Sequence, residues 1–166
     1  MQLPDAEKLA QTMAQQLGPY LNANSALVGM HTGGVWLAER IHALLGKDIP
    51  LGTLDVSFYR DDFNQSGLHA EVAPSDIPFD VTWRYIILVD DVLYTGRSVR
   101  AAMNELFDYG RPSSIMLAVL VDRGGRELPI SSQVTGAVLA LAPDQNIQLN
   151  RDPQGRLSLS LRQITA

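Results

Sequence analysis

Hydrophobic positions in the first third of the chain follow the period of helices and the short runs of buried strands. Apolar residues recur at helical spacing through residues 4–17, which predicts a helix that stops at a Gly-Pro pair. The apolar run 25–30 predicts a strand, and the glycine-containing segment 31–34 predicts a turn. Residues 35–45 have helical spacing and end at a glycine, whereas residues 51–59 alternate between apolar and polar positions as a strand does.

The rest of the chain repeats this succession of strand and helix after one long interruption. Residues 60–82 show no period and are rich in Asp, Asn, Ser and Pro, so we expect a flexible loop of the kind that often forms a lid. The apolar run 86–89 predicts a buried strand, and residues 97–109 predict an amphipathic helix. Two further apolar runs, 115–121 and 134–141, predict more strands.

Strands that alternate with helices indicate an α/β fold with a parallel, doubly wound sheet and right-handed crossovers. No repeat, low-complexity tract or linker divides residues 1–166, so we expect a single domain. In the tail, leucines alternate with polar residues between positions 157 and 161, which favours a terminal strand or an edge hairpin.

Composition narrows the classes of protein that the chain can belong to. The net charge is −5, and the basic residues, eleven Arg and two Lys, are scattered, which lowers the expectation of RNA binding without excluding it. The chain has no cysteine, which excludes disulfides and thiolate metal sites. It shows neither a secretory pattern nor an apolar run of the ~18 residues that a membrane span needs, so we expect a cytoplasmic protein without membrane association.

Candidate chemistry concentrates in residues 86–98, IILVDDVLYTGRS, where an apolar run meets Asp90 and Asp91 and then a Thr-Gly turn before a helix. The backbone N–H groups and partial positive charge of a helix start bind phosphate, and Thr95 and Ser98 add hydroxyl donors. The two carboxylates, about one sugar length away, can accept hydrogen bonds from ribose hydroxyls. The alternative is a simple turn in which the carboxylates only cap the helix.

This string resembles the 5-phosphoribosyl 1-pyrophosphate (PRPP) signature of the type I phosphoribosyltransferases. Six segments in order, GMHTGGVWLAER, LDVSFYRDD, DIPFD, VDDVLYTGRSVRAAMNEL, YGRPSSIMLAVLVDRGGRELPI and VTGAVLAL, are similar to the PyrR family. That family combines regulation of pyrimidine operons with uracil phosphoribosyltransferase activity. The resemblance covers nearly the whole chain.

The resemblance implies a fold, a reaction and partners. The implied fold is the parallel sheet of type I phosphoribosyltransferases with a flexible lid loop and a small hood region. The implied reaction converts uracil and PRPP to UMP and pyrophosphate with Mg²⁺. Regulation by transcription attenuation in response to uridine nucleotides, with leader RNA as partner, and a homo-oligomeric state are also implied.

Site residues follow from the same resemblance, position by position. The 5-phosphate loop is Tyr94, Thr95, Gly96, Arg97 and Ser98, and the pyrophosphate loop is His31, Thr32, Gly33 and Gly34. Asp90 and Asp91 are expected to hold the ribose hydroxyls, or Mg²⁺ through its waters. Arg60 is expected to reach the pyrophosphate. The base is expected to lie against Val121, Asp122, Arg123, Val134 and Thr135.

Several of these assignments have an alternative. Many relatives carry a basic residue at position 31 or 33, where this chain has His31 and Gly33, so His31 is either a cation beside the pyrophosphate or a polar turn residue. Arg60 has the alternative of an exposed ion-paired turn. Val121 and Val134 have the alternative of core packing. Gly125 replaces a histidine of many relatives, which puts one base or RNA contact in doubt.

Two other functions remain open from the sequence. A phosphoribosyltransferase for a purine or for orotate would use the same phosphate loop, because that loop does not read the base. A regulator that binds RNA and senses UMP or PRPP without catalysis would use the same cavity. Residues outside the loop, and assays, must separate these from the uracil enzyme.

Overall fold

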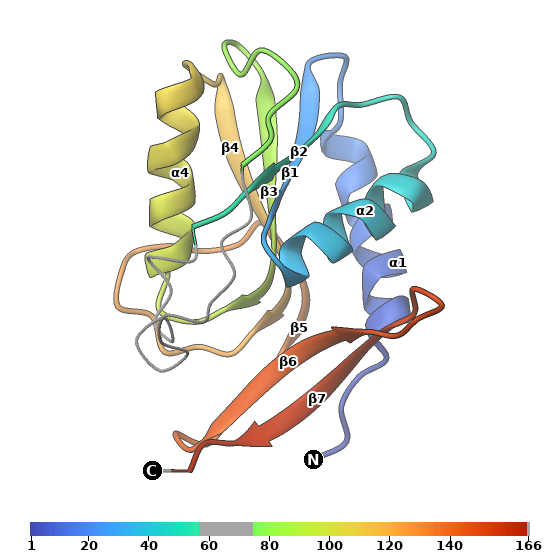
Figure 1. Cartoon of the computed structure of the whole chain (residues 1–166), viewed down its shortest axis with the longest axis vertical. Coiled ribbons are helices and arrows are strands. Elements are labelled where there is room, and N and C mark those ends of the chain that lie inside the picture. The colour runs from blue at the N-terminus through green and yellow to red at the C-terminus, as the bar shows by residue number, and fades with distance from the viewer. Residues whose placement is uncertain (57–74, 166) are drawn as a thin grey trace.

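The computed structural model describes residues 1–56 and 75–165. A five-stranded, fully parallel sheet in the order β2-β1-β3-β4-β5 forms its centre (Figure 1). The strands are β1 (Ser25–Met30), β2 (Leu51–Leu54), β3 (Tyr85–Leu93), β4 (Ser114–Asp122) and β5 (Val134–Val138). The expected α/β fold with a parallel sheet is confirmed.

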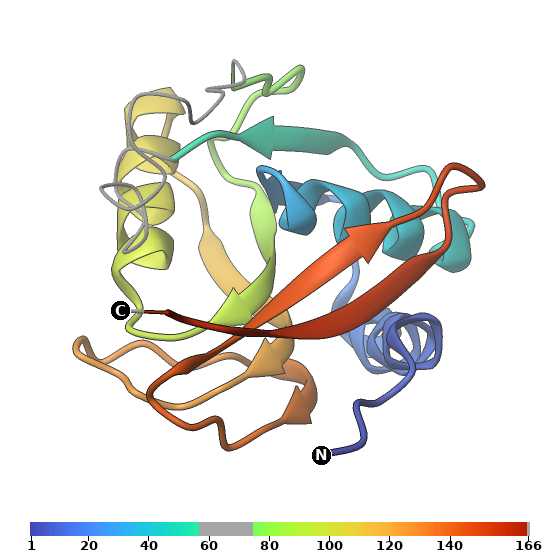
Figure 2. The same cartoon turned by 60° about the horizontal axis from the view of Figure 1, so that its bottom comes forward.

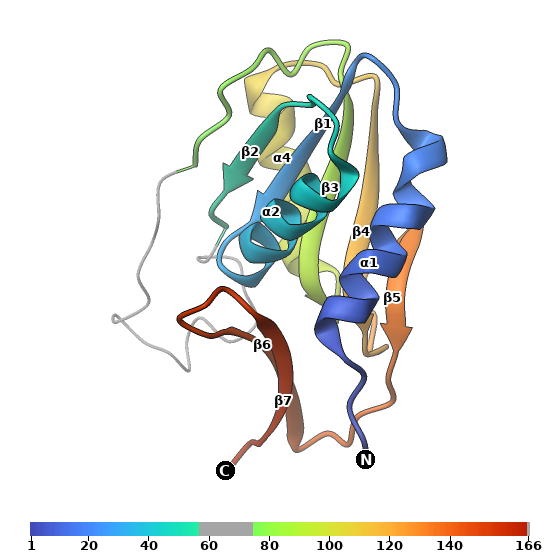
Figure 3. The ribbon, with the colours of Figure 1, turned by 90° about the vertical axis from the view of Figure 1, so that its right-hand side faces the viewer.

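Helices cover both faces of the sheet, as Figures 1 and 3 show. Helices α1 (Ala6–Leu17) and α2 (Gly33–Leu45) pack on one face, and α4 (Arg97–Tyr109) packs on the other. A short 3₁₀ turn, η1 (Gly18–Tyr20), follows α1 at the predicted Gly-Pro stop. Each face has its own buried apolar cluster, which is why the central strands are apolar on both sides.

The tail forms the edge hairpin that its alternating leucines predicted. Strands β6 (Gln145–Arg151) and β7 (Leu157–Gln163) pair antiparallel in a separate two-stranded sheet. Figures 1 and 2 show this hairpin crossing below the carboxyl ends of the parallel strands. Ile147, Leu149 and Leu157 bury their side chains in the cluster that α1 and α2 also form, so apolar contact holds the hairpin against the body of the protein.

Helix α2 approaches the sheet unusually closely because three glycines leave room for it. A Cβ on Gly29 would lie 2.8 Å from the carbonyl oxygen of Gly34, and one on Gly34 would lie 2.6 Å from the carbonyl oxygen of Val89. A Cβ on Gly33 would lie 2.7 Å from Cγ of Asp91. The start of α2 therefore lies directly against the carboxyl ends of β1 and β3.

Element boundaries differ from the sequence predictions where tertiary pairing extends or shortens an element. Strand β3 does not end before the acidic pair but continues to Leu93, because Asp90 and Val92 pair with residues of β4. Helix α2 begins at Gly33 and not at residue 35, so both glycines of the predicted turn form its first turn. Strand β5 ends at Val138, three residues early.

Part of the chain for which the sequence made predictions is not described by the structure. Most of the expected lid, residues 60–74, and the end of the expected strand 51–59 lie outside the described residues. Trp83 is 60% exposed and stacks under the guanidinium of Arg111, whose central carbon lies 4.7 Å from the ring centroid. Among the helices that the structure describes, none is long and apolar enough to cross a bilayer.

Candidate active site

A cavity of about 830 Å³ lies between the carboxyl edge of the sheet and the C-terminal hairpin. Its wall comes from four parts of the chain: the start of α2, the end of β3 with the following loop, the segment after β4, and the hairpin. The main lining residues are Thr32, Gly33, Trp36, Asp90, Asp91, Val92, Tyr94, Ser98, Arg123, Asn146, Gln148 and Arg162. Ligands of α/β proteins bind at this edge of a parallel sheet.

The loop from β3 to α4 forms an anion-binding turn on one side of the cavity. Gly96 has φ +94° and is the N-cap residue of α4, and as a glycine it has no side chain that could cap the helix. The hydroxyl of buried Thr95 accepts a hydrogen bond from the Arg97 N–H at 3.2 Å. A hollow of about 40 Å³ is lined by this loop, including Ser98, and by Asp90. Uncapped N–H groups at a helix start suit a phosphate.

The two carboxylates lie beside this turn, at the end of β3. Asp90 is 3% exposed, and one of its oxygens accepts a hydrogen bond from the Asp91 N–H at 2.9 Å. Asp91 is half-buried and accepts from the Val92 N–H at 2.9 Å. Both residues line the cavity, and the carboxylate of Asp91 also touches Gly33. The structure thus brings the acidic pair together with both predicted loops.

The predicted pyrophosphate loop, residues 31–34, runs into α2, and its two glycines are the first two residues of the helix. Thr32 precedes the helix and makes no side-chain cap, and Thr32 and Gly33 line the cavity. The backbone of half-buried His31 bonds to the Leu54 carbonyl at 2.8 Å, and the peptide bond between His31 and Thr32 is cis. Two helix starts, those of α2 and α4, therefore flank the acidic pair.

The segment after β4 braces the phosphate loop through Arg126. This guanidinium pairs with Asp122 at 2.5 Å and donates to the carbonyl oxygens of Tyr94 at 2.9 Å and Ile130 at 2.8 Å. The hydrogen bond from Arg126, together with one from the Gly124 N–H, holds the pKa of Asp122 below its ordinary value, although partial burial acts in the opposite direction. The predicted base-contact residue Asp122 is thus engaged in a structural ion pair.

Arg123 bridges the phosphate loop and the hairpin. Its guanidinium lies 4.0 Å from the ring centroid of Tyr94, and Nη1 donates to the side-chain oxygen of Asn146 at 3.2 Å. Its Nε is buried and has no hydrogen-bond partner among the described residues. Because an orphaned buried N–H is costly, this atom is suited to donate to a ligand in the cavity.

The structure places the other predicted base contacts away from the cavity wall. Val121 and Val134 are buried in the core cluster beneath α1, as the alternative of core packing described. The hydroxyl of Thr135 bonds to that of Ser132 at 2.5 Å. Of the five predicted base residues, Arg123 lines the cavity. Arg60 lies outside the described residues.

Sequence reasoning missed the residues that the hairpin contributes. Asn146 and Gln148 line the cavity from β6, Arg162 lines it from β7, and Trp36 lines it from α2. The alternation of polar and apolar residues in 145–151 indicates a strand with one buried face and one face toward solvent or a cavity. Nothing local showed that this face would turn toward the phosphate loop.

The acidic pair could hold Mg²⁺ with few protein ligands. Within the described residues, no group of three or more His, Cys, Asp or Glu side chains could hold a metal ion. Asp90 and Asp91 supply two neighbouring carboxylates at the cavity wall. Mg²⁺ keeps several waters and needs one or two carboxylates besides substrate oxygens, so this donor set suits it.

Comparisons with known proteins first define the class. The family model described as a phosphoribosyl transferase domain matches residues 2–146. A hypoxanthine-guanine phosphoribosyltransferase from Bacillus anthracis superposes with a TM-score of 0.66 at 15% identity, covering 89% of this chain and 87% of that chain. A purine phosphoribosyltransferase from Pyrococcus horikoshii gives 0.61 at 24% identity, covering 80% and 81%. The chain has the type I phosphoribosyltransferase fold.

Curated relatives then give the family. The Bifunctional protein PyrR of Pseudomonas savastanoi pv. phaseolicola is 51% identical over 154 residues, which span 90% of this chain and 91% of the relative. The protein of that name from Nitrosococcus oceani is 53% identical over 143 residues, or 85% and 81%. The chain belongs to the PyrR family. The predicted family and the predicted enzyme class, a phosphoribosyltransferase, are confirmed.

The Asp122–Arg126 pair generates a prediction about acid stability. Because the folded pKa of Asp122 is lowered, its charge stabilises the fold above the unfolded carboxyl pKa of ~3.9, and this contribution is lost as pH falls through the folded pKa. We expect Asp122→Asn to lower the free energy of unfolding by about 1 kcal/mol at pH 7. Urea titrations at pH 7 and pH 3 should show this difference shrinking at pH 3.

The exposed Asp48→Asn change, in the turn before β2, is the matched control and should leave both titrations near those of the parent. An Asp122→Asn deficit of equal size at both pH values would contradict the assigned role of the carboxylate.

Proposed function

We propose that this chain transfers the phosphoribosyl group of PRPP to uracil, giving UMP and pyrophosphate. The observation that carries the proposal is the meeting of two helix starts, whose N-cap residues Thr32 and Gly96 make no side-chain cap, with Asp90 and Asp91 on one cavity wall. A ligand with a phosphate at each end and a sugar between them matches this order of groups. In the reaction the bond from ribose C1 to pyrophosphate breaks, a bond from C1 to N1 of uracil forms, and uracil loses the N1 proton.

Each end of PRPP has its own part of the wall in this proposal. The 5-phosphate binds the loop Tyr94, Thr95, Gly96, Arg97 and Ser98 at the start of α4. The pyrophosphate binds His31, Thr32, Gly33 and Gly34 at the start of α2. Arg60, outside the described residues, is proposed to add positive charge there. The ribose then lies over the acidic pair of β3.

Catalysis in this arrangement rests on positioning and on stabilising separated charge. Positive charge builds on the ribose ring as pyrophosphate leaves. Asp90 and Asp91 face that charge and accept hydrogen bonds from the ribose hydroxyls. The same two carboxylates would hold Mg²⁺ through its waters, and the ion would supply positive charge to the departing pyrophosphate.

The base is proposed to lie between Arg123 and the hairpin. The unpartnered Nε of Arg123 would donate to a carbonyl oxygen of uracil, and Asn146 and Gln148 offer further polar groups nearby. A planar pyrimidine needs an apolar wall and a few fixed donors and acceptors. The predicted contacts of Val121, Asp122, Val134 and Thr135 with the base stay predictions.

Membership of the PyrR family favours uracil over the other bases. The two superposed structures are named as a hypoxanthine-guanine and a purine phosphoribosyltransferase, but at identities of 15% and 24% they show the fold alone. Base choice resides in the segment after β4 and in the hairpin, since the phosphate loop contacts only the sugar phosphate.

The central test of the function is the change Asp91→Asn. We expect the parent to release pyrophosphate from PRPP when uracil is added, and not with hypoxanthine, guanine or orotate. We expect Asp91→Asn to lose roughly 10²–10³-fold in kcat with its fold retained, because its amide stabilises positive charge poorly.

Asp108→Asn, an exposed change on α4, is the matched control and should retain full activity. A parent that uses only a purine would overturn the choice of uracil. An Asp91→Asn variant as active as the parent would overturn the assigned catalytic geometry.

A regulatory role completes the proposal, supported by relatives that are named bifunctional. UMP would occupy the cavity of the enzyme as the signal, and leader RNA is the partner that the family resemblance implies. The net charge of −5 provides little phosphate neutralisation for RNA. A homo-oligomeric state and a cytoplasmic location belong to the same proposal.

RNA binding should therefore be weak in this chain. In filter-binding assays with its own pyrimidine leader transcript, we expect a Kd above about 1 μM at 0.15 M salt. A nanomolar complex that UMP strengthens and that salt weakens steeply would contradict this expectation.

A further inference from the structure

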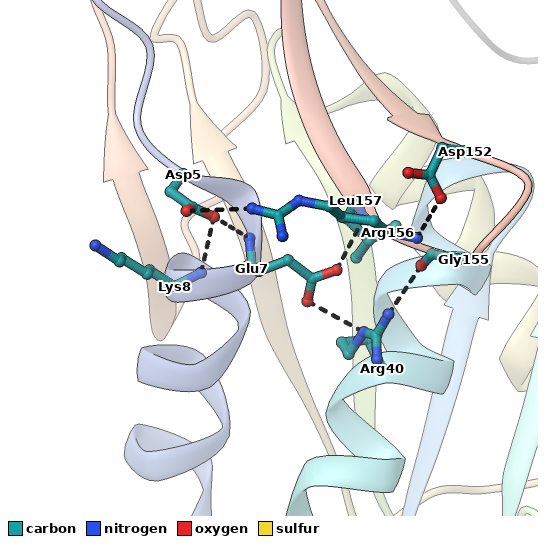
Figure 4. Close-up of polar contacts among 8 residues, drawn as sticks. All are labelled: Asp5, Glu7, Lys8, Arg40, Asp152, Gly155, Arg156 and Leu157. Atoms are coloured by element: carbon teal, nitrogen blue, oxygen red, sulfur yellow. Dashed lines mark hydrogen bonds and ion pairs between the residues drawn. The ribbon is translucent and has the colours of Figure 1, made fainter.

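The turn of the C-terminal hairpin is bound to two helices through one ion pair, Glu7 with Arg40 (Figure 4). One oxygen of Glu7, on α1, accepts the Leu157 N–H at 2.8 Å, and the other lies 3.2 Å from Nε of Arg40 on α2. Nη2 of Arg40 donates to the carbonyl oxygen of Gly155 at 2.8 Å. Glu7 and Arg40 therefore form an ion pair with each other, and each also makes one hydrogen bond with the backbone of the hairpin.

The hairpin turn that receives these bonds is itself well defined. The carboxylate of Asp152 accepts from the N–H groups of Gln154 at 2.9 Å and Arg156 at 2.8 Å. The Gly155 N–H donates to the Asp152 carbonyl at 2.9 Å, and Gly155 has φ +84°. Because the turn is internally bonded, a shift at its contact with Arg40 moves the strands on either side of it.

Helix α2 links this contact to the proposed pyrophosphate loop. The helix starts at Gly33 in the cavity wall and carries Arg40 two turns further on. Between them, Trp36 lines the cavity and stacks under Arg151 of β6 at 4.9 Å, while Glu39 pairs with Arg151 at 3.5 Å. These contacts fix the position of the hairpin relative to α2, the helix that begins at the proposed pyrophosphate loop.

Apolar burial alone would leave the hairpin free to slide. Ile147, Leu149 and Leu157 bury their side chains against the body of the protein, but hydrophobic contact has no direction. The two hydrogen bonds to the hairpin, from the Leu157 N–H to Glu7 and from Arg40 to the Gly155 carbonyl, do have a direction. The contact between Glu7 and Arg40 is an ion pair without a hydrogen bond, and the two side chains are only 20% and 36% exposed. The outer pair Asp5–Arg156 is longer, at 3.8 Å, and more exposed, at 38% and 67%.

We propose that Glu7 and Arg40 are positioning residues for the base. They fix the hairpin at one distance from α2, so that the cavity-lining residues of β6, Asn146 and Gln148, lie where the base is proposed to bind. This inference rests on the proposed uracil transfer. Neither residue touches substrate, and neither lines the cavity.

The test separates binding of the base from binding of PRPP. Glu7→Gln keeps an acceptor for the Leu157 N–H and removes the charge that holds Arg40. We expect KM for uracil to rise about 5–10-fold, with KM for PRPP within about 2-fold of the parent, because the 5-phosphate loop lies on β3 and α4. Arg40→Gln should give the same pattern, and the double variant should add little, since the two residues act as one unit.

Arg156→Gln is the matched control. It removes the exposed pair with Asp5 at the same turn and should leave both KM values unchanged. Thermal melts establish the folded fraction of each variant, and Arg40→Lys, which keeps the charge toward Glu7, decides the test if Glu7→Gln does not fold. Partial recovery of KM for uracil in Arg40→Lys relative to Arg40→Gln supports a positioning role.

Two failures can be told apart. Parental KM values in folded Glu7→Gln and Arg40→Gln, or equal rises in both KM values, would overturn the positioning role while leaving the uracil activity of the parent in place. A parent without uracil-dependent pyrophosphate release would overturn the proposed function and, with it, this inference.

Discussion

The contact between the start of helix α2 and the end of strand β3 is the constraint on which the rest of the site depends. Gly29 and Gly34 let the helix backbone reach the sheet, and Gly33 then lies against the carboxylate of Asp91. The start of α4 lies on the other side of the same carboxylates. Two regions of partial positive charge therefore flank one region of negative charge, which is the charge order of a phosphorylated sugar that carries pyrophosphate.

The segment after β4 and the C-terminal hairpin complete the wall of the cavity. The segment after β4 braces the phosphate loop, because Arg126 bonds to Tyr94 and the N–H of Glu127 donates to the Thr95 carbonyl at 2.9 Å. The hairpin forms the opposite wall and supplies polar side chains where the base is proposed to lie. In the proposed function, the sheet and its two helix starts bind PRPP, while the segment after β4 and the hairpin contact the base.

Local patterns in the sequence predicted the elements whose limits are set locally. Strand β1 and helix α4 have the predicted bounds; the run of apolar residues limits β1, and the glycines at positions 96 and 110 mark the ends of α4. The extent of β3 was missed because partners on β4, and not its own residues, carry the pairing past Asp91. The predicted phosphate loop and the acidic pair are contiguous in the sequence, so a local pattern was enough to propose them. The contact between Arg123 and Asn146 joins two distant segments, so no local pattern could predict it, and the burial of Val121 and Val134 in the core was open as an alternative.

A crystal structure of the protein with bound UMP tests whether the acidic pair and the start of α4 hold one sugar phosphate. We expect density for the phosphate in the loop at the start of α4, ribose hydroxyls within about 2.6–3.2 Å of the carboxylates of Asp90 and Asp91, and the base between Arg123 and β6. Density that places the phosphate elsewhere, with both carboxylates turned away from the sugar, would contradict this arrangement.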